Sequence, residues 1–553
     1  MECTRVFSVI LLVSMIALPA TAQSFRVQCP TSTVTHPDLT NSGVNNSEPP
    51  YVGPTALSTA SNGYQVPTNI NGAIKCQQIS GGDGYATMAD GTQSFMFSFG
   101  PLSGLADIAA GLPGTEFPNV FNTVYSGTFA PGDPATTDGA SETGLAYTPG
   151  VLGAFTYNGA IGLTPDIDAN QGSGTTGAPL DGHVDPRQIM DIGVMNGNIP
   201  APLMAFDEDD EFFLTLTNVG MIMRPDLFEQ HTVHFHGYPN ASSIYDGVPD
   251  ASVAINIGGS FTYYYLAPDA GTYFWHCHIT PPEHLQMGMV GQLYVRPRQN
   301  RVPVGSSLYT ALQRQNGQNL AAGQVPDLRT VCNPASDILC STTLPAGNTV
   351  VQRISPSTNQ PYKYAYNDGD GSTRYDVEYP LQIHGFDPNF HFVGMTFNPE
   401  AFADMKDKYF LLNGRSYPDT VTPGPMATQS SDGRMHYSQP LPSIINIPAG
   451  GRALLRIADL DVSEYQTLAS MGIPMTVVGF NAKLLRDQDG NNLFYNTNSI
   501  TLGGGESLDV ILDASDTTKY PAGSVFYLYT PNLDHLSNDA ENFGGLMTEV
   551  RIK

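Results

Sequence analysis

The stretch GTYFWHCHITPPEHLQMGM, residues 271–289, begins like a buried strand and then places a cysteine between two histidines. Aromatic and β-branched residues up to Trp275 favour a strand. Successive side chains of a strand point to opposite faces of its sheet. We therefore expect His276 and His278 to share one face and Cys277 to point to the other.

A second string, HTVHFHG at residues 231–237, supplies matching imidazoles. On a regular strand, His234 and His236 share a face, and His231 points to the opposite one. If the two strings lie side by side, one face collects four imidazoles, those of His234, His236, His276 and His278. The other face collects His231 and Cys277. The sequence thus predicts two metal sites back to back, joined through the backbone of one tripeptide.

The face that carries Cys277 has the composition of a copper site. His284 follows on a Pro-Pro loop, and Met289 comes five residues later. A thiolate, two imidazoles and a weak axial thioether form the blue-copper ligand set. The four-imidazole face suits further copper, or zinc. Structural zinc usually draws paired cysteines, which these strings lack, and six of the twelve histidines cluster here, so we predict copper.

An internal repeat indicates how the chain is organised. The first half reads NGNIPAP, FFLTLTN, HTVHFHGYP, GGSFTYYY and AGTYFWHCH, and the second reads NGRSYPDT, ALLRIAD, YQTLASMGIP, GGGESLDVILD and AGSVFYLYT. This shared order predicts an all-β protein of two Greek-key β-sandwich domains of one kind. The 56 glycines, the 43 prolines and the low charged fraction of 14% favour the same class.

The second half of the repeat lacks the metal-binding residues of the first. Matching TVHFHGYP with TLASMGIP sets Gln466, Ala469 and Met471 opposite His231, His234 and His236. Matching AGTYFWHCH with AGSVFYLYT sets Leu528, Tyr529 and Thr530 opposite His276, Cys277 and His278. None of these replacements binds copper well. We therefore expect the second domain to be a scaffold without copper.

The N-terminus, MECTRVFSVILLVSMIALPATAQ, predicts a secretory signal peptide that is cut after Ala22. No later stretch is long and apolar enough to span a bilayer, so we expect a secreted or periplasmic protein. Export permits disulfides. Closeness in sequence pairs Cys29 with Cys76 and Cys332 with Cys340, which leaves Cys277 free.

Composition and motifs divide the chain into five predicted segments. They are a signal peptide (1–22), an irregular N-terminal segment (23–85), a copper-binding domain (86–298), a connector (299–375) and a second domain without copper ligands (376–553). The formal net charge of −27 argues against nucleic acid as a partner, because both would carry negative charge.

The strings HTVHFHG, DGVPD, GGSFTYYY and GTYFWHCHITPPEHLQMGM resemble the multicopper oxidase family of cupredoxins. The resemblance is strong over about residues 190–298 and weaker over 376–553. It implies a type 1 copper held by His231, Cys277, His284 and Met289. It also implies a type 2/type 3 copper half-site made of His234, His236, His276 and His278. Electrons from a donor, such as a phenol or a metal ion, would pass through the Cys–His link to a cluster that reduces oxygen.

Two features depart from the family pattern. The spacing from Cys277 to His284 is longer than in typical laccases and closer to copper nitrite reductases. Those reductases, however, lack the second histidine of HCH and carry a carboxylate where this chain has His234. The family's trinuclear cluster also needs eight histidines, half of them from another domain, and the second half of this chain does not match them.

Of three interpretations, we predict the first and keep the other two as alternatives. The first is a copper-dependent oxidoreductase. The second is a non-enzymatic copper-binding or electron-transfer protein with an incomplete trinuclear site. The third is a homo-oligomer in which a neighbouring chain completes the cluster. Among the remaining histidines, His384 and His535 are the candidates to close over the four-imidazole face.

Overall fold

The structure is a computed structural model. It describes residues 29–38, 45–53, 55–67, 69–104, 107–108, 110–121, 156–157, 160–161, 195–221, 224, 229–267, 269–313, 324–326, 344, 350–395, 401–429, 435–487 and 489–553. The predicted signal peptide and the predicted bridge between Cys332 and Cys340 lie outside the described residues.

Two sheets enclose the first hydrophobic core. One has the strand order β10-β12-β13-β8, and the other has the order β11-β9-β3-β4, with β7 beside β3. Their strands are β3 (Ile74–Thr87), β4 (Gln93–Pro101), β7 (Met195–Gly197), β8 (Met204–Asp207), β9 (Glu211–Gly220), β10 (His234–His236), β11 (Ser260–Leu266), β12 (Gly271–His276) and β13 (Val290–Arg296). Side chains from both sheets fill one apolar cluster that includes Phe97, Leu214, Phe235 and Trp275. We call this unit the first sandwich.

Two larger sheets enclose the second core and form the second sandwich. One has the order β18-β17-β22-β28-β24-β25, with β26 beside β24, and the other has the order β21-β30-β29-β23-β27. Their strands are β17 (Val377–Phe386), β18 (Tyr409–Leu412), β21 (Ile445–Ile447), β22 (Arg452–Asp459), β23 (Gln466–Met471), β24 (Met475–Phe480), β25 (Lys483–Leu484), β26 (Tyr495–Thr497), β27 (Ser499–Leu502), β28 (Ser507–Asp513), β29 (Val525–Tyr529) and β30 (Met547–Ile552). Leu381, Leu455, Leu468 and Leu528 are among its core residues.

The remaining elements are short. The strands are β1 (Ala56–Thr59), β2 (Gln65–Pro67), β5 (Thr156–Tyr157), β6 (Ala160–Ile161), β14 (Gln324–Pro326), β15 (Lys363–Tyr364), β16 (Arg374–Tyr375), β19 (Met426–Gln429) and β20 (Met435–Ser438). The α-helices are α3 (Pro118–Phe121), α6 (Pro281–Gln286), α7 (Leu308–Gln313) and α8 (Pro388–Met395). The 3₁₀ helices are η1 (Ser243–Tyr245), η2 (Arg298–Arg301), η5 (Phe402–Asp404), η6 (Asp419–Val421) and η7 (Leu533–His535). No helix in the described part of the chain combines the length and the apolar character that a bilayer span requires.

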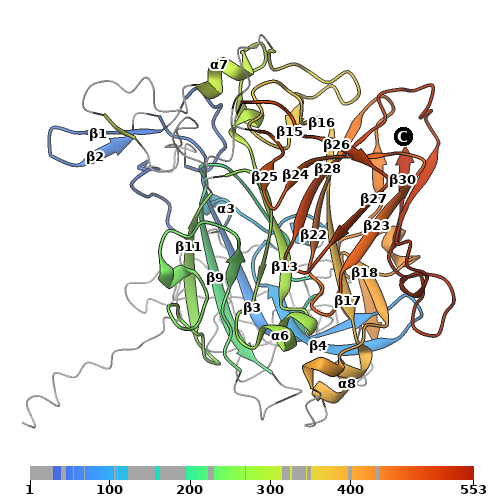
Figure 1. The fold of residues 1–553 in the computed structure, drawn as a ribbon. Helices are drawn as coiled ribbons and strands as arrows, with labels where there is room; N and C mark the ends of the chain where they lie inside the picture. Colours follow the sequence, from blue (N-terminus) through green and yellow to red (C-terminus); the bar gives the residue numbers. More distant parts are fainter. Residues whose placement is uncertain are drawn as a thin grey trace, which may run out of the picture.

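The predicted all-β class is confirmed, and the described strands form two sandwiches (Figure 1). Within the segment predicted to be irregular, residues 74–85 belong to β3, which lies between β4 and β9. The sequence of β3, IKCQQISGGDGYAT, hides this strand because buried polar residues and glycines replace the usual apolar alternation. The predicted irregular segment therefore ends earlier than residue 85.

The predicted disulfide between Cys29 and Cys76 is confirmed, and it ties the N-terminal segment to β3. Next to it, Lys75 is buried among three carboxylates, those of Glu48, Asp207 and Asp210, at 2.6, 3.5 and 2.9 Å. The ammonium group offsets part of the negative charge of this acidic cluster and pairs with all three carboxylates. The three carboxylates are therefore a structural ion-pair network and not a cation site.

The two sandwiches meet along β12. The Thr272 hydroxyl donates to Asp509 Oδ1 at 2.6 Å, and the Ser507 hydroxyl donates to the Thr272 carbonyl at 2.6 Å. On the adjacent strand β13, the Gln292 side chain donates to the Arg456 carbonyl at 2.7 Å. Strand β12, which ends at the first histidine of the HCH string, thus lies at the junction between the sandwiches.

Candidate metal centre

Strands β10 and β12 pair as the alternation of their side chains predicts. The pairing is antiparallel and sets His234 opposite His276 and His236 opposite Phe274. The His234 ring centroid lies 5.9 Å from that of His236 and 5.2 Å from those of His276 and His278. The structure therefore brings the four imidazoles together, on the same face of the two strands.

Hydrogen bonds orient two of these rings. Nδ1 of His276 donates to the Cys277 carbonyl at 2.7 Å, and Nδ1 of His234 donates to the Asp246 carbonyl at 2.6 Å. A ring that donates through Nδ1 keeps the lone pair of Nε2 available for a metal. Burial lowers the pKa of His276 to about 3, so this ring is neutral, as a ligand must be.

On the opposite side of the HCH tripeptide, His231, Cys277 and His284 converge. One potential ligand atom from each residue lies within 4.8 Å of the other two, and all three side chains are fully buried. His284 Nδ1 is 3.3 Å from Cys277 Sγ. His231 lies outside the regular strand, in an isolated bridge to Ile255. These three predicted residues are thus gathered in one buried cluster.

The loop after Cys277 closes back onto it through the backbone. The Met289 amide donates to the His284 carbonyl at 2.8 Å, and the Cys277 amide donates to the Met289 carbonyl at 3.0 Å. Met289 is fully buried in the same apolar cluster as Cys277, and so is Met287, which sequence reasoning passed over. His284 lies on a helix, α6, and not on the predicted loop, because prolines are tolerated in the first turn of a helix.

Charge interactions favour a thiolate in the copper-free protein. Burial alone would raise the pKa of the Cys277 thiol, but the charge on the His284 ring and its hydrogen bond outweigh burial, and the pKa is lowered. Burial likewise opposes a charged His284, yet Cys277 and Glu229 together raise the pKa of this imidazole to about 9. Both shifts favour an ion pair between a Cys277 thiolate and a protonated His284, and a metal ion bound there would displace the proton.

The buried nitrogen atoms of His231 fit a metal-binding role. Neither Nδ1 nor Nε2 has a hydrogen-bond partner, although the ring is fully buried. Burial lowers the pKa of His231 far below its usual value, so the ring is neutral. An unpaired buried nitrogen is unfavourable by about 1–3 kcal/mol unless another group satisfies it. A soft metal ion bound beside Cys277 would satisfy one of them.

Sequence reasoning missed Gly81 on β3, which makes room for the His231 ring. A Cβ atom added to Gly81 would lie 2.6 Å from Cδ2 of His231. The only signal in the sequence was the glycine-rich GGDG run inside β3, since a glycine within a strand often marks a close approach. This strand shapes the buried cluster even though it carries no ligand.

The second sandwich repeats the same framework without the ligands. Its β23–β29 pairing sets Ala469 opposite Tyr529 and Ser470 opposite Leu528. If Ala469 takes the place of His234, then Tyr529 takes the place of His276, so the predicted match of Leu528 with His276 is wrong by one residue. Leu528 points into the core. A slip of one residue moves a side chain to the other face of a strand, and matching the Ala-Gly pairs before the two strands caused that slip.

Backbone hydrogen bonds extend this correspondence beyond the strands. The Thr530 amide donates to the Leu546 carbonyl at 2.9 Å, as Cys277 does to Met289. The Leu546 amide donates to the His535 carbonyl at 3.0 Å, as Met289 does to His284. His535 is therefore the counterpart of His284, and it lies 3.0 Å from the side-chain oxygen of Gln466. A hydrogen-bonded pair, His535 and Gln466, thus occupies the place of the predicted copper ligands His284 and His231.

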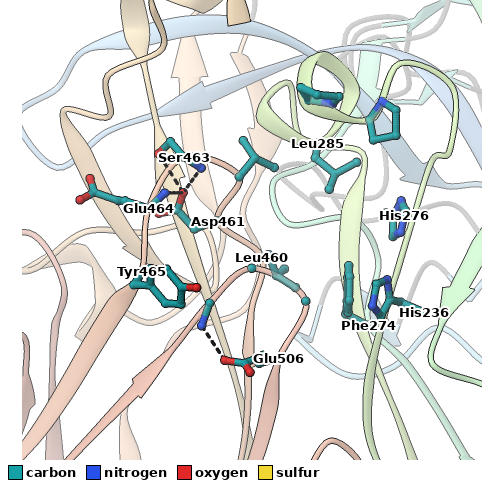
Figure 2. A pocket seen from close by; sticks show the side chains of 16 residues that line it. His236, Phe274, His276, Leu285, Leu460, Asp461, Ser463, Glu464, Tyr465 and Glu506 are labelled. Atoms are coloured by element: carbon teal, nitrogen blue, oxygen red, sulfur yellow. Dashed lines mark hydrogen bonds between the residues drawn. The ribbon is translucent and has the colours of Figure 1, made fainter. Parts of the chain in front are cut away.

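A cavity of about 630 Å³ separates the four-imidazole face from the second sandwich. Figure 2 shows His236, Phe274 and His276 on one wall and acidic residues on the other. The residues of that second wall are Leu460, Asp461, Val462, Ser463, Glu464, Tyr465, Gly503, Gly504, Gly505 and Glu506. Among the described lining residues, this wall contributes carboxylates and no imidazole. His384 and His535 do not line the cavity and do not close over the four-imidazole face.

Comparison with known proteins identifies relatives of this region. Residues 181–300 match the family model described as multicopper oxidase. The chain is 35% identical over 112 residues to a multicopper oxidase, MCE, of Talaromyces pinophilus, which covers 20% of this chain and 17% of that protein. It is 32% identical over 133 residues to the multicopper oxidase MmcO of Mycobacterium tuberculosis, covering 22% and 25%. The chain thus matches only a quarter or less of the length of these relatives.

Among solved structures, the blue copper oxidase of Nitrosomonas europaea is similar, with 20% identity and a TM-score of 0.39 over 65% of this chain and 78% of that chain. The matched segment contains both histidine strings and the intervening strand β11. By these sequence matches, the region of the chain that contains both histidine strings is similar to multicopper oxidases.

Proposed function

We propose that this chain is an exported copper-dependent oxidoreductase of the multicopper oxidase type, which accepts electrons from a donor at a type 1 copper in the first sandwich. The observation that carries the proposal is the buried convergence of His231, Cys277 and His284. Copper bound there would supply one-electron transfer between Cu(I) and Cu(II). The thiolate of Cys277, the imidazoles of His231 and His284 and the thioether of Met289 would hold the ion.

The chain prepares these ligands before a metal arrives. The Thr232 amide lies 3.4 Å from Cys277 Sγ and donates to it, which stabilises negative charge on the sulfur. The proton that this thiolate loses is held by His284, whose ring also lies 3.5 Å from Glu229. Copper binding releases that proton, so we expect copper affinity at this site to fall as the pH is lowered.

The HCH tripeptide supports electron transfer from the buried cluster to the four-imidazole face. Cys277 is joined by single peptide bonds to His276 and His278, whose rings lie on the opposite face. The hydrogen bond from His276 Nδ1 to the Cys277 carbonyl adds a second connection. The route therefore needs no solvent-exposed step.

The four-imidazole face supports a second copper site of limited size. His234, His236, His276 and His278 supply half of the histidines that a trinuclear cluster needs. The described wall across the cavity offers carboxylates instead. This observation favours one alternative function, an electron-transfer protein whose second site is incomplete. If the chain is instead an oxidase, reduction of oxygen would require a homo-oligomer in which a neighbouring chain adds the missing ligands.

The proposed donor and compartment rest on separate features of the chain. A phenol or a reduced metal ion is the expected donor, and the partly exposed carboxylate of Glu229 lies next to the His284 ring. Export is supported by the N-terminal signal-like sequence and by the disulfide between Cys29 and Cys76, because disulfides persist in oxidising compartments.

The test uses the copper-loaded protein, separated by size into monomer and oligomer. A phenolic donor is added without oxygen while the visible absorption band is followed, and oxygen uptake is then measured for each fraction. We expect the band to bleach in both fractions and oxygen uptake to be weak in the monomer. Rapid uptake by a monomer with full copper loading would contradict the half-site. A protein without a copper-dependent visible band would contradict the proposed function as a whole.

A further inference from the structure

Helix α6, which carries His284, is held by residues of the second sandwich. The carbonyls of its last two residues, Leu285 and Gln286, and the side chain of Gln286 form hydrogen bonds with residues between positions 384 and 407. Figure 1 shows α6 close to α8 and β17, at the junction of the two sandwiches. None of these contacting residues is a copper ligand. They nevertheless surround the two residues that follow His284.

Two histidines of the second sandwich contact the carbonyls of α6. His384, on β17, donates from Nε2 to the Leu285 carbonyl at 3.1 Å. His391, on α8, has Nε2 at 3.0 Å from the Gln286 carbonyl and Nδ1 at 2.7 Å from the Phe95 carbonyl on β4. Both rings are buried. The end of α6 is therefore tied both to the second sandwich and to β4.

The Gln286 side chain makes two further bonds across the same junction. Its amide nitrogen donates to Asp407 Oδ1 at 2.9 Å. Its oxygen accepts from the Asp387 amide at 3.3 Å. Leu285 packs against an apolar cluster that includes Ala458 and Leu460 from the second half of the chain. Polar and apolar contacts thus both hold α6 against the second sandwich.

Helix α6 needs such contacts, because it is too short to be stable alone. It has six residues, and its N-cap residue, Thr280, makes no side-chain capping bond. Isolated helices of this length are not stable in water, since nucleation is unfavourable and few hydrogen bonds follow. The direction in which α6 presents His284 therefore depends on what the helix packs against.

We propose that the second sandwich, which lacks copper ligands, positions the type 1 site of the first by clamping α6 through His384 and the Gln286–Asp407 pair. His384 and Asp407 are positioning residues, since neither contacts the candidate ligands. This inference rests on the proposed type 1 site. It gives the second sandwich a specific role in copper binding, and it explains two buried histidines that the ligand pattern left unexplained.

The test compares three variants of the whole chain. His384→Leu removes the donor, His384→Gln keeps an amide donor close to the position of Nε2, and His535→Leu is the matched control. His535 is also a buried histidine of the second sandwich, but it stacks on Phe410 and does not contact α6. Copper affinity is measured by competition with a chromogenic Cu(I) chelator, together with the visible band and the reduction potential.

We expect His384→Leu to weaken copper binding at the thiolate site about tenfold, which is typical for loss of a group that orients a ligand. His384→Gln should recover most of that loss, and His535→Leu should leave the affinity and the potential unchanged. Hydrogen exchange in the copper-free protein supplies a second readout. The amides of residues 283–289 should exchange faster in His384→Leu and not in His535→Leu.

The outcomes separate this inference from the proposed function. If wild type shows no copper-dependent visible band, the type 1 site itself is wrong. If wild type shows the band and His384→Leu matches His535→Leu in affinity, potential and exchange, the clamp is wrong and the site stands. Should His384→Leu fail to fold, Asp407→Leu compared with Asp407→Asn applies the same test to the Gln286 bond. Equal copper affinity in that pair would overturn the clamp.

Discussion

The strand pair β10–β12 and the strand pair β23–β29 share one framework and differ in what they carry. Both pairs are antiparallel. In both, the amide of the residue after the second strand of the pair donates to the carbonyl of the residue just before the next strand, β13 or β30. The first pair presents His234 opposite His276. The second presents Ala469 opposite Tyr529. The framework therefore forms with or without metal-binding side chains.

The cores explain why the framework survives this exchange. Val233 and Trp275 face the core of the first sandwich, and Leu468 and Leu528 face the core of the second. Burial of such side chains stabilises each sandwich, at about 25 cal/mol per Å² of apolar surface. The imidazoles of His234 and His276 lie on the other face of β10 and β12, away from this core. A sandwich with this framework can thus fold without copper ligands.

The largest expected effect compares Cys277 with its counterpart Thr530. Cys277→Ser removes the only free thiol among the described residues, so the intense visible band of the copper-loaded protein should disappear. Thr530→Ser, at the matching position of the second sandwich, should leave the band unchanged. Absorption spectra and the copper content per chain are compared between the two variants and wild type. A Cys277→Ser protein that keeps the band would refute the assignment of the thiolate.

The comparison also predicts a gain of function. The double variant Gln466→His and Thr530→Cys gives the second sandwich a thiolate and two imidazoles, together with His535, in the arrangement of the first. We expect one additional copper per chain and a second visible band from thiolate to copper. Metal analysis of the purified variant measures this directly. If the extra thiol binds no copper, the two frameworks differ in geometry and the correspondence of His535 with His284 is incorrect.

A smaller effect is expected at Gly81, which has no ligand role. In Gly81→Ala the new methyl group would lie 2.6 Å from the His231 ring, so the ring or the strand must move. Overpacking of this kind lowers the free energy of unfolding by about 1–3 kcal/mol. Chemical denaturation of the copper-free protein checks the stability, and a shifted visible band checks the displaced ligand. An unchanged stability and spectrum would show that β3 does not shape the site.

The smallest effect concerns pH and the partly exposed Asp407. Burial, and then the nearby charge of Asp461, raise the pKa of this carboxyl to about 8. Since the folded protein binds a proton that the unfolded chain has released above pH 4, this carboxyl stabilises the fold at low pH, and that contribution is lost as the pH rises towards 8. Asp407→Asn should therefore gain stability relative to wild type as the pH rises from 5 to 8. Parallel pH dependences for the two proteins would contradict the raised pKa.

Much of the candidate site could be predicted from two short strings. The alternation of side chains in HTVHFHG and HCH was enough to place four imidazoles on one face, because strand geometry alone determines it. The turn of the chain that brings His284 back to Cys277 was predicted only as a loop. Its helix depends on contacts with residues about a hundred positions away, such as His384, and local propensity does not contain them.

The remaining differences have physical causes in particular residues. Strand β3 was missed because Gln77, Gln78 and Gly81 replace the apolar residues that mark a buried strand. The predicted match of Leu528 with His276 is wrong by one residue, because the two strings were aligned on the Ala-Gly pair that precedes each strand. Only strand pairing reveals which face a residue occupies. The role of the second wall of the cavity was likewise invisible, since its carboxylates come from separate loops.

The central claim is that copper binds in the first sandwich and not at the matching place in the second. Crystals of the copper-loaded chain, measured at the copper absorption edge, test it most directly through an anomalous difference map. We expect a peak bounded by His231, Cys277 and His284, and no peak beside Gln466, Thr530 and His535. A peak beside the second set, or an empty map at the first in crystals with confirmed copper content, would contradict it.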